Sequence, residues 1–233
     1  MTLLSPRLAV LLQMLAPCAT LADIGSDHAM LISGAVQAGK AQRGIAVEIN
    51  LAPFRESQRA VCRAGLQGRI EVRRGDGLAP LGVGEVDAIC CAGMGGGTIS
   101  QILVKGESKL SAVRQMLLQP NVDGGKLRQH LLGTGFRVTD DQLVEDGAYT
   151  YQLIYAEPGR ELTPYSPLEL EYGRHNLARR SSLLGTLLAR DISHWKKVRA
   201  ELKRSNTEGS ELRRRQVDEW ITQLEEAEKL AHC

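Results

Sequence analysis

The sequence predicts an α/β protein with a mostly parallel sheet, an antiparallel hairpin at the end of that sheet, and a C-terminal pair of helices. Short apolar runs alternate with helical stretches of about ten residues in the first part of the chain, which is typical of parallel strands joined by right-handed crossovers. Residues 137–158 then read as two strands separated only by a turn at Glu145-Asp146-Gly147. So short a connection requires antiparallel pairing.

Each expected element follows from local periodicity and boundary residues. Strands are expected at 20–25, 43–49, 70–78, 86–97 and 114–121. Helices are expected at 6–15, 29–39, 51–66, 98–106 and 125–136. In the stretch 51–66, Pro53 near the start and Gly65 near the end are typical helix boundaries. A parallel sheet closed by an antiparallel hairpin is the arrangement of Rossmann-like methyltransferase domains.

The C-terminal part of the chain reads as a linker followed by a helical hairpin. Residues 157–173 carry three prolines and are predicted to be a linker. Apolar residues recur at helical spacing in 174–206 and again in 210–230. Two long amphipathic helices joined by a turn indicate an antiparallel, coiled-coil-like hairpin. We therefore expect two domains, residues 1–160 and 161–233.

Composition excludes several classes of protein. With 43% hydrophobic residues the chain can bury a core, and its net charge of only +2 excludes a histone-like nucleic-acid binder. The five cysteines include no CxxC pair, which argues against a zinc site or a disulfide framework and indicates a reducing, cytoplasmic compartment. Arg7 and Gln13 interrupt the apolar N-terminal stretch, which we expect to be a packed helix rather than a membrane span or a signal peptide.

Charge is unevenly distributed over the expected helical hairpin. Lys and Arg outnumber Asp and Glu between 174 and 215, whereas the last eighteen residues are acidic. A basic helical surface favours contact with a phosphate backbone. The candidate nucleic-acid-binding residues are Arg179, Arg180, Lys196, Lys197, Lys203 and Arg204. The alternative is that the hairpin serves only as a packing or dimerisation arm.

Polar or glycine-rich residues follow four successive strands of the expected sheet. They are residues 23–28, Glu48, residues 75–77 and residues 92–97. Ligands of open α/β sheets bind at the carboxyl ends of the strands, so four such clusters at one edge indicate a binding site. A single cluster would be weaker evidence, because an aspartate at a strand end often only caps the next helix.

Each cluster has residues that fit a nucleotide-like ligand. Gly25 allows close approach of the backbone, and Glu48 at a strand end can accept hydrogen bonds from two ribose hydroxyls. Asp76 can accept a hydrogen bond from an exocyclic amino group. The stretch GMGGGT does not match the dinucleotide fingerprint, because Thr98 occupies its last position and the stretch follows the fourth strand. An NAD site is therefore not favoured.

The motifs DIGSDHA, RRGDGL, AGMGG and LLQPN, with the acidic end of the second strand, resemble those of the bacterial tRNA adenine-22 N1-methyltransferase family. The similarity continues through EDGAYTYQLIYAEP and SPLELEYG into the helical tail, so it covers essentially the whole chain. It implies a class I methyltransferase domain, S-adenosylmethionine as methyl donor, and a helical hairpin that helps to hold tRNA. The chain departs from the family pattern SDHAYLP at Met30 and Ile32, and from a proline after LELEYG at Arg174.

The resemblance also implies roles for individual residues. The cofactor-binding candidates are Asp23, Gly25, Ser26, Glu48, Ile49, Asp76, Gly77, Ala92, Gly93, Met94 and Gly95. The catalytic candidates are Asp27, His28 and Asn121. Among them, Glu48 would hold the ribose of the cofactor, and Asp76 and Gly77 would meet its adenine. No metal ligand is expected.

Methylation of adenine N1 needs alignment more than a strong base, because N1 already carries a lone pair at neutral pH. The base becomes cationic as the methyl arrives, so a nearby carboxylate stabilises the developing charge. We expect Asp27 in this role, with His28 as its neighbour and Asn121 as an amide partner. The expected function is methylation of N1 of adenine 22 in tRNA by a monomer. The alternatives are a methyltransferase for another RNA or a small molecule, and a non-catalytic RNA-binding adaptor.

Overall fold

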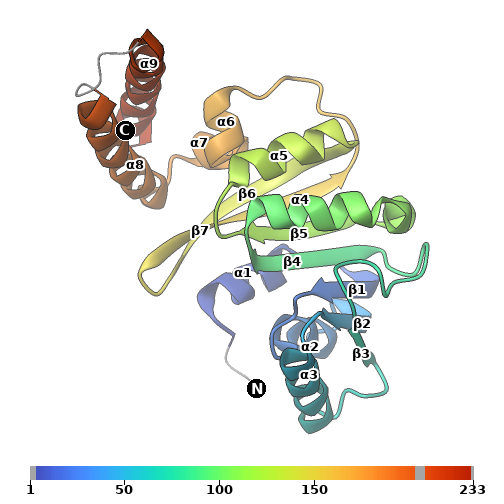
Figure 1. Cartoon of the computed structure of the whole chain (residues 1–233). Helices are drawn as coiled ribbons and strands as arrows, with labels where there is room; N and C mark the ends of the chain where they lie inside the picture. Colours follow the sequence, from blue (N-terminus) through green and yellow to red (C-terminus); the bar gives the residue numbers. More distant parts are fainter. Residues whose placement is uncertain (1–3, 203–207, 232–233) are drawn as a thin grey trace. The chain divides into compact units, whose positions relative to one another are not determined.

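The structure is a computed structural model that describes residues 4–202 and 208–231. It divides into two compact units, Met1–Pro164 and Tyr165–Cys233, which are described separately (Figure 1). None of the helices in the described ranges combines the length and the apolar character needed to cross a membrane.

The first unit is built on a seven-stranded sheet with the order β3-β2-β1-β4-β5-β7-β6 (Figure 1). The strands are β1 (Cys18–Ile24), β2 (Ala41–Glu48), β3 (Ile70–Arg74), β4 (Ala88–Met94), β5 (Gln115–Pro120), β6 (Phe136–Asp146) and β7 (Tyr149–Pro158). The first five pair in parallel, and β7 runs antiparallel to both β5 and β6. This confirms the predicted sheet with its antiparallel hairpin. The strand order reverses between β1 and β4, which makes their carboxyl ends the expected ligand site.

Helices cover both faces of this sheet. They are α1 (Pro6–Met14), α2 (Met30–Gln37), α3 (Leu51–Arg63), α4 (Gly96–Lys105), the 3-10 helix η1 (Glu107–Ala112) and α5 (Gly124–Gly133). The first three pack on one face, with Leu11, Ile32 and Val61 in that core. The α4 and α5 helices pack on the other face, with Ile99 and Leu127 in the second core (Figure 1).

Several boundaries in this unit differ from the sequence prediction. The α4 helix begins at Gly96 rather than at Thr98, because the N–H of Gly96 donates to the carbonyl of Val122 at 2.8 Å. A Cβ on Gly96 would collide with the carbonyl oxygen of Asp123, so this glycine is required for packing. The α5 helix ends at Gly133, and Phe136 starts β6 instead of ending the helix. The strand predicted at 70–78 ends at Arg74.

The second unit consists of α6 (Pro167–Tyr172), α7 (Arg174–Arg179), α8 (Ser182–Leu202) and α9 (Glu208–Ala231). The α8 and α9 helices pair side by side through buried residues that include Leu188 and Leu224. Ion pairs join Lys196 to Glu225 at 2.7 Å and Arg199 to Asp218 at 3.3 Å. The partner's number falls as the first residue's number rises, so the two helices are antiparallel, as the sequence predicts.

Two predictions for this unit are wrong. Part of the predicted linker is helical, because Ser166 and Glu169 form a capping box that starts α6. The predicted single helix 174–206 is broken at Arg180, whose left-handed backbone (φ 49°) ends α7 before α8 begins. The end of that predicted helix, residues 203–206, lies outside the described residues.

Candidate functional site

The loop after β1 has an unusual backbone. Gly25, Asp27, His28 and Ala29 all have positive φ angles, of 67°, 37°, 67° and 53°. Residues other than glycine rarely adopt this left-handed conformation, and three of them in succession mark a strained segment. Such strain persists only where neighbouring structure holds it, and it concentrates at functional sites. We therefore take this loop as the centre of the candidate site.

Two hydrogen bonds from β2 hold the strained loop. The N–H of Gly25 donates to the carbonyl of Val47 at 2.9 Å. The N–H of Asp27 donates to Oε1 of Glu48 at 2.6 Å. Glu48 is 5% exposed, and burial raises the pKa of its carboxyl group, while the Asp27 N–H opposes that rise. Glu48 therefore links the end of β2 directly to the residue that carries the candidate catalytic carboxylate.

Asp23, at the end of β1, holds the same loop through a hydrogen bond with Ser26. Its carboxylate accepts a hydrogen bond of 2.6 Å from the hydroxyl of Ser26, and it is 3% exposed. Burial raises the pKa of Asp23 to about 6, with the Ser26 hydroxyl acting in the opposite direction and Glu48 adding to the rise. Both residues are buried, and their hydrogen bond fixes the shape of the loop from inside.

Asp27 and His28 point in the other direction, toward solvent. Their side chains are 79% and 52% exposed, and Nε2 of His28 lies 3.5 Å from Oδ1 of Asp27. The left-handed backbone thus turns an acceptor and an imidazole outward at the carboxyl end of β1. A carboxylate in this place can accept a hydrogen bond from a base or stabilise a developing positive charge.

The ends of β4 and β5 are joined by a chain of amide hydrogen bonds. The N–H of Gly93 donates to Oε1 of Gln119 at 3.0 Å, and Nε2 of Gln119 donates to Oδ1 of Asn121 at 2.9 Å. Nδ2 of Asn121 donates back to the carbonyl of Gly93 at 2.8 Å. Gly93 has φ 79°, which explains why glycine stands there. The predicted Asn121 is therefore a fixed part of the site.

Met94 brings the β4 end next to the β1 loop. Its Cε would lie 3.5 Å from a Cβ built on Gly25, so the thioether lies over the start of the strained loop. Its neighbours Ala92 and Gly95 flank it, Ala92 within β4 and Gly95 as the N-cap residue of α4. The structure thus brings the β1 and β4 candidates together at the switch point of the sheet.

The remaining cofactor candidates lie at the ends of β2 and β3. Ile49 is 55% exposed, an apolar side chain directly after the buried Glu48. Gly77 has φ 54°, and Asp76 is exposed beside Lys105, whose Nζ lies 3.2 Å from its carboxylate. A surface ion pair of this kind contributes little energy, so a ligand amino group can compete for Asp76.

Sequence reasoning missed two residues of this edge, Gln119 and Arg7. Gln119 is fully buried in β5, and Nη1 of Arg7 donates to its Oε1 at 2.6 Å. A signal was present, because a glutamine inside the apolar run MLLQP requires a buried hydrogen-bond partner. Arg7 was used only as an interruption of an apolar helix.

The basic residues predicted to bind nucleic acid have different surroundings in the second unit. Arg179 and Arg180 are exposed at the end of α7, and Lys197 is exposed on α8. Lys196 is already paired with Glu225, and this pairing lowers the pKa of Glu225. The predicted contacts Lys203 and Arg204 lie outside the described residues.

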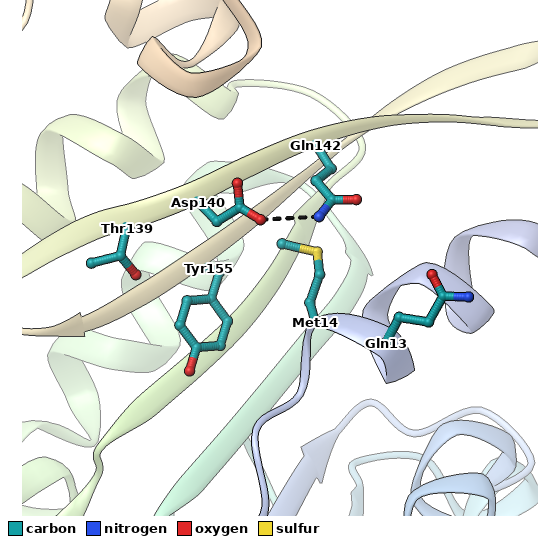
Figure 2. A pocket seen from close by; sticks show the side chains of 6 residues that line it. All are labelled: Gln13, Met14, Thr139, Asp140, Gln142 and Tyr155. Atoms are coloured by element: carbon teal, nitrogen blue, oxygen red, sulfur yellow. Dashed lines mark hydrogen bonds between the residues drawn. The ribbon is translucent and has the colours of Figure 1, made fainter. Parts of the chain in front are cut away.

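A cavity of about 370 Å³ lies at a different place in the first unit (Figure 2). It is lined by Gln13, Met14, Thr139, Asp140, Gln142 and Tyr155. The Tyr155 hydroxyl donates to Oε1 of Gln115, the first residue of β5, at 3.2 Å. The cavity therefore lies toward the amino ends of the parallel strands and is separate from the candidate site.

The model of the tRNA (adenine(22)-N(1))-methyltransferase family, TrmK, matches residues 21–226 of this chain. The chain belongs to this family. A curated Bacillus subtilis tRNA (adenine(22)-N(1))-methyltransferase is 37% identical over 188 residues, which is 81% of this chain and 76% of the relative. The region that the family model matches includes the strained loop, the β4–β5 amide chain and most of the helical hairpin.

Solved structures agree with this membership. The crystal structure of the B. subtilis m1A22 tRNA methyltransferase TrmK has a TM-score of 0.92 and 30% identity, covering 98% of this chain and 100% of that chain. A Streptococcus pneumoniae relative in complex with S-adenosyl-L-methionine has a TM-score of 0.80 and 28% identity, covering 95% and 98% of the two chains. Within the described residues, no group of three His, Cys, Asp or Glu is placed to hold a metal ion.

Proposed function

We propose that the carboxyl edge of β1, β2, β4 and β5 is where this protein transfers a methyl group from S-adenosyl-L-methionine to N1 of adenine 22 in tRNA. The protein is an S-adenosyl-L-methionine-dependent tRNA (adenine-N1)-methyltransferase, as its family membership establishes. The observation that carries the location is the hydrogen bond from the Asp27 N–H to Glu48, at 2.6 Å. It joins a buried carboxylate suited to the cofactor to an exposed carboxylate suited to the target base.

The residues at this edge fit the cofactor. Gly25 and Gly77 have left-handed backbones, with φ of 67° and 54°, in which a side chain would be strained, so both loops keep turns that favour glycine. Glu48 offers a buried acceptor for ribose hydroxyls, and Ile49 offers an exposed apolar side chain for the adenine ring. The full set that we assign to the cofactor is Asp23, Gly25, Ser26, Glu48, Ile49, Asp76, Gly77, Ala92, Gly93, Met94 and Gly95.

Bound S-adenosyl-L-methionine supplies the methyl group, and its sulfur keeps the electron pair of the broken bond. Adenine N1 attacks through its own lone pair, so the protein needs to align the base rather than deprotonate it. Asp27 accepts a hydrogen bond from the exocyclic amine and stabilises the positive charge that forms on the base. His28 lies beside Asp27, and Asn121 contacts the base through its amide.

Methyl transfer from labelled S-adenosyl-L-methionine to tRNA, followed by nucleoside analysis, tests the proposal. We expect 1-methyladenosine in tRNA with adenine at position 22, and none in the same tRNA with guanine at that position. Label in the guanine-22 tRNA, or in small molecules after nuclease treatment, would contradict the assigned substrate. Label in neither substrate would favour a non-catalytic RNA-binding adaptor.

We also propose that residues 161–233 form the tRNA-binding domain, with Arg179, Arg180, Lys196, Lys197, Lys203 and Arg204 contacting phosphates. Removing one Lys or Arg that contacts a phosphate lowers the slope of log affinity against log salt concentration by about one. Because Glu225 already neutralises Lys196, Lys197→Ala should reduce tRNA affinity and this slope more than Lys196→Ala. Equal slopes for both variants and the unsubstituted protein would contradict the phosphate contact. We propose that the protein acts as a cytoplasmic monomer, and sedimentation of the purified protein tests its oligomeric state.

A further inference from the structure

Arg7 on α1 reaches the candidate site from outside the sheet. Its Nη1 donates to Oε1 of Gln119 at 2.6 Å, and its Nε lies 3.5 Å from Oδ2 of Asp146. Its guanidinium carbon lies 5.2 Å from the centre of the Tyr151 ring. Arg7 therefore connects α1, the turn of the β6–β7 hairpin and the end of β5, although it contributes to none of the motifs at the strand ends.

The hydrogen bonds around Gln119 have only one self-consistent direction. Arg7 Nη1 and the Gly93 N–H are both donors, so the atom of Gln119 that they share must be its oxygen. The Gln119 nitrogen then faces Asn121 and meets Oδ1 of that residue. The Asn121 nitrogen is left to donate to the Gly93 carbonyl. The N–H and carbonyl of Gly93 set the orientation of both amides, and the Arg7 guanidinium adds a second, charged donor that holds Gln119 Oε1 in place.

We propose that Arg7 is a positioning residue for methyl transfer, acting through Gln119 to hold the Asn121 amide in the place where it meets the target base. The proposal rests on the assignment of Asn121 to the base-binding site. With this orientation, Asn121 keeps one N–H and one oxygen lone pair beyond the bonds described above. A guanidinium donor makes a shorter and stronger hydrogen bond than a neutral donor. The Arg7–Gln119 bond is therefore the strongest hydrogen bond in this series.

Four variants separate this role from simple packing. Arg7→Met keeps a long side chain and removes the side-chain hydrogen bond to Gln119 and the ion pair with Asp146. Gln119→Glu keeps an oxygen for Arg7 and Gly93 but removes the N–H that Asn121 accepts. Asp146→Asn is the matched control, because it breaks the ion pair of Arg7 with the hairpin and leaves the bond to Gln119. Arg7→Lys restores a cationic donor to the chain.

The measurements are the single-turnover rate of methyl transfer at saturating tRNA, the dissociation constant for S-adenosyl-L-methionine, and the side-chain amide NMR signals of Gln119 and Asn121. We expect Arg7→Met and Gln119→Glu each to slow the rate about 10–100-fold, because small misplacements of a reacting base have effects of that size. Cofactor affinity should stay within about threefold, since it depends on other contacts. Arg7→Lys should recover part of the rate, and Arg7→Met should shift the Asn121 amide signals.

The combined Arg7→Met, Gln119→Glu variant should be no slower than the slower single variant, because both act on one chain of bonds. A rate for Arg7→Met within about threefold of that of the unsubstituted protein would overturn the proposal. An equal loss in Asp146→Asn would overturn it as well, since Arg7 would then act only by docking the hairpin. If the unsubstituted protein does not methylate adenine 22, the proposed function fails, whereas the NMR shifts still decide whether Arg7 controls the amide.

Discussion

Two clusters of buried polar side chains in the first unit differ in how their charges are balanced. At the carboxyl edge of the sheet, Asp23 and Glu48 are buried close enough together that Glu48 raises the pKa of Asp23 further, and the loop above them is strained. On α5, Arg128 is fully buried and donates to Asp141 Oδ1 at 2.9 and 2.7 Å through Nε and Nη2. Arg128 also donates to Oε1 of Gln152 at 2.8 Å.

Burial of a polar group does not by itself indicate a functional site. A paired and hydrogen-bonded charge such as Arg128 holds elements together, here α5, β6 and β7. Two buried carboxylates that lie close together, under a backbone that most residues avoid, oppose folding, and such an arrangement is typical of binding sites. Variants of the two clusters, and of the exposed Asp27 in the loop above the first, distinguish a loss of stability from a loss of function.

The largest effect is expected for Arg128→Met. This variant leaves the Asp141 carboxylate buried without its guanidinium, so the free energy of unfolding should fall by about 3–5 kcal/mol. The measurement is urea unfolding followed by circular dichroism. The control is Arg137→Met, which removes an exposed ion pair with Glu157 at 3.5 Å and should change stability by less than about 0.5 kcal/mol. If Arg128→Met is as stable as its control, the structural role assigned to the Arg128 cluster is wrong.

The next effect is expected for Asp27→Ala. Removing a group that stabilises charge in the transition state slows an enzyme about 10²–10³-fold. Methyl transfer should slow by this factor, while the affinity for S-adenosyl-L-methionine and the midpoint of thermal unfolding change little, because the hydrogen bond of Asp27 to Glu48 comes from its backbone N–H and the carboxylate is exposed. Near-normal turnover would remove Asp27 from the catalytic residues. A large loss of stability would indicate that the Asp27 side chain has a structural role, like that of Arg128.

The two clusters also differ in how far the sequence predicts them. The strand-end residues of the site were predictable, because sheet topology gathers the ends of β1, β2 and β4 at one edge whatever the details of packing. The Arg128–Asp141 pair was not, since a basic residue on an amphipathic helix and an acidic residue on a strand have no sequence signal that they are buried together. Arg7 was missed for the same reason, because its partner Gln119 lies far away in the sequence.

Boundaries that depend on tertiary contacts were also mispredicted. Gly96 was placed at the end of the strand expected at 86–97, yet its packing against the carbonyl of Asp123 places it in the first turn of α4. Proline-rich composition suggested a linker before Tyr172, whereas the capping box at Ser166 and Glu169 starts a helix there. Local composition therefore predicted the order of the elements better than their ends.

A smaller effect is expected for Glu48→Gln. The amide oxygen can still accept the Asp27 N–H, so the loop should keep its conformation, but the carboxylate for the ribose hydroxyls is lost. Loss of a hydrogen bond to a charged group costs about 1.5–3 kcal/mol, so calorimetry should show cofactor binding weakened about 10–100-fold. Glu56→Gln on the surface of α3 serves as the control and should bind normally. Unchanged affinity in Glu48→Gln would exclude Glu48 from the ribose site.

The sharpest test of the difference between the clusters is the pH dependence of stability in Asp23→Asn. Burial raises the pKa of Asp23 to about 6 in the folded protein, from 3.8. The folded state therefore binds more protons than the unfolded state between these values, so Asp23 lowers stability as pH rises from about 4 to about 6.

The amide introduced by Asp23→Asn cannot ionise, so the stability of the variant relative to the unsubstituted protein should rise over that pH range and stay constant above it. A rise in pKa from 3.8 to about 6 corresponds to a gain on the order of 3 kcal/mol between pH 4 and pH 7, measured by urea unfolding at a series of pH values. Glu48 adds to this gain in stability. Without the Asp23 charge nearby, the Glu48 carboxyl group ionises more easily. A variant that is less stable at pH 7 than at pH 4, relative to the unsubstituted protein, would show that Asp23 is stabilised as an ion. The two polar clusters would then be alike, and strain in the loop alone would distinguish the site.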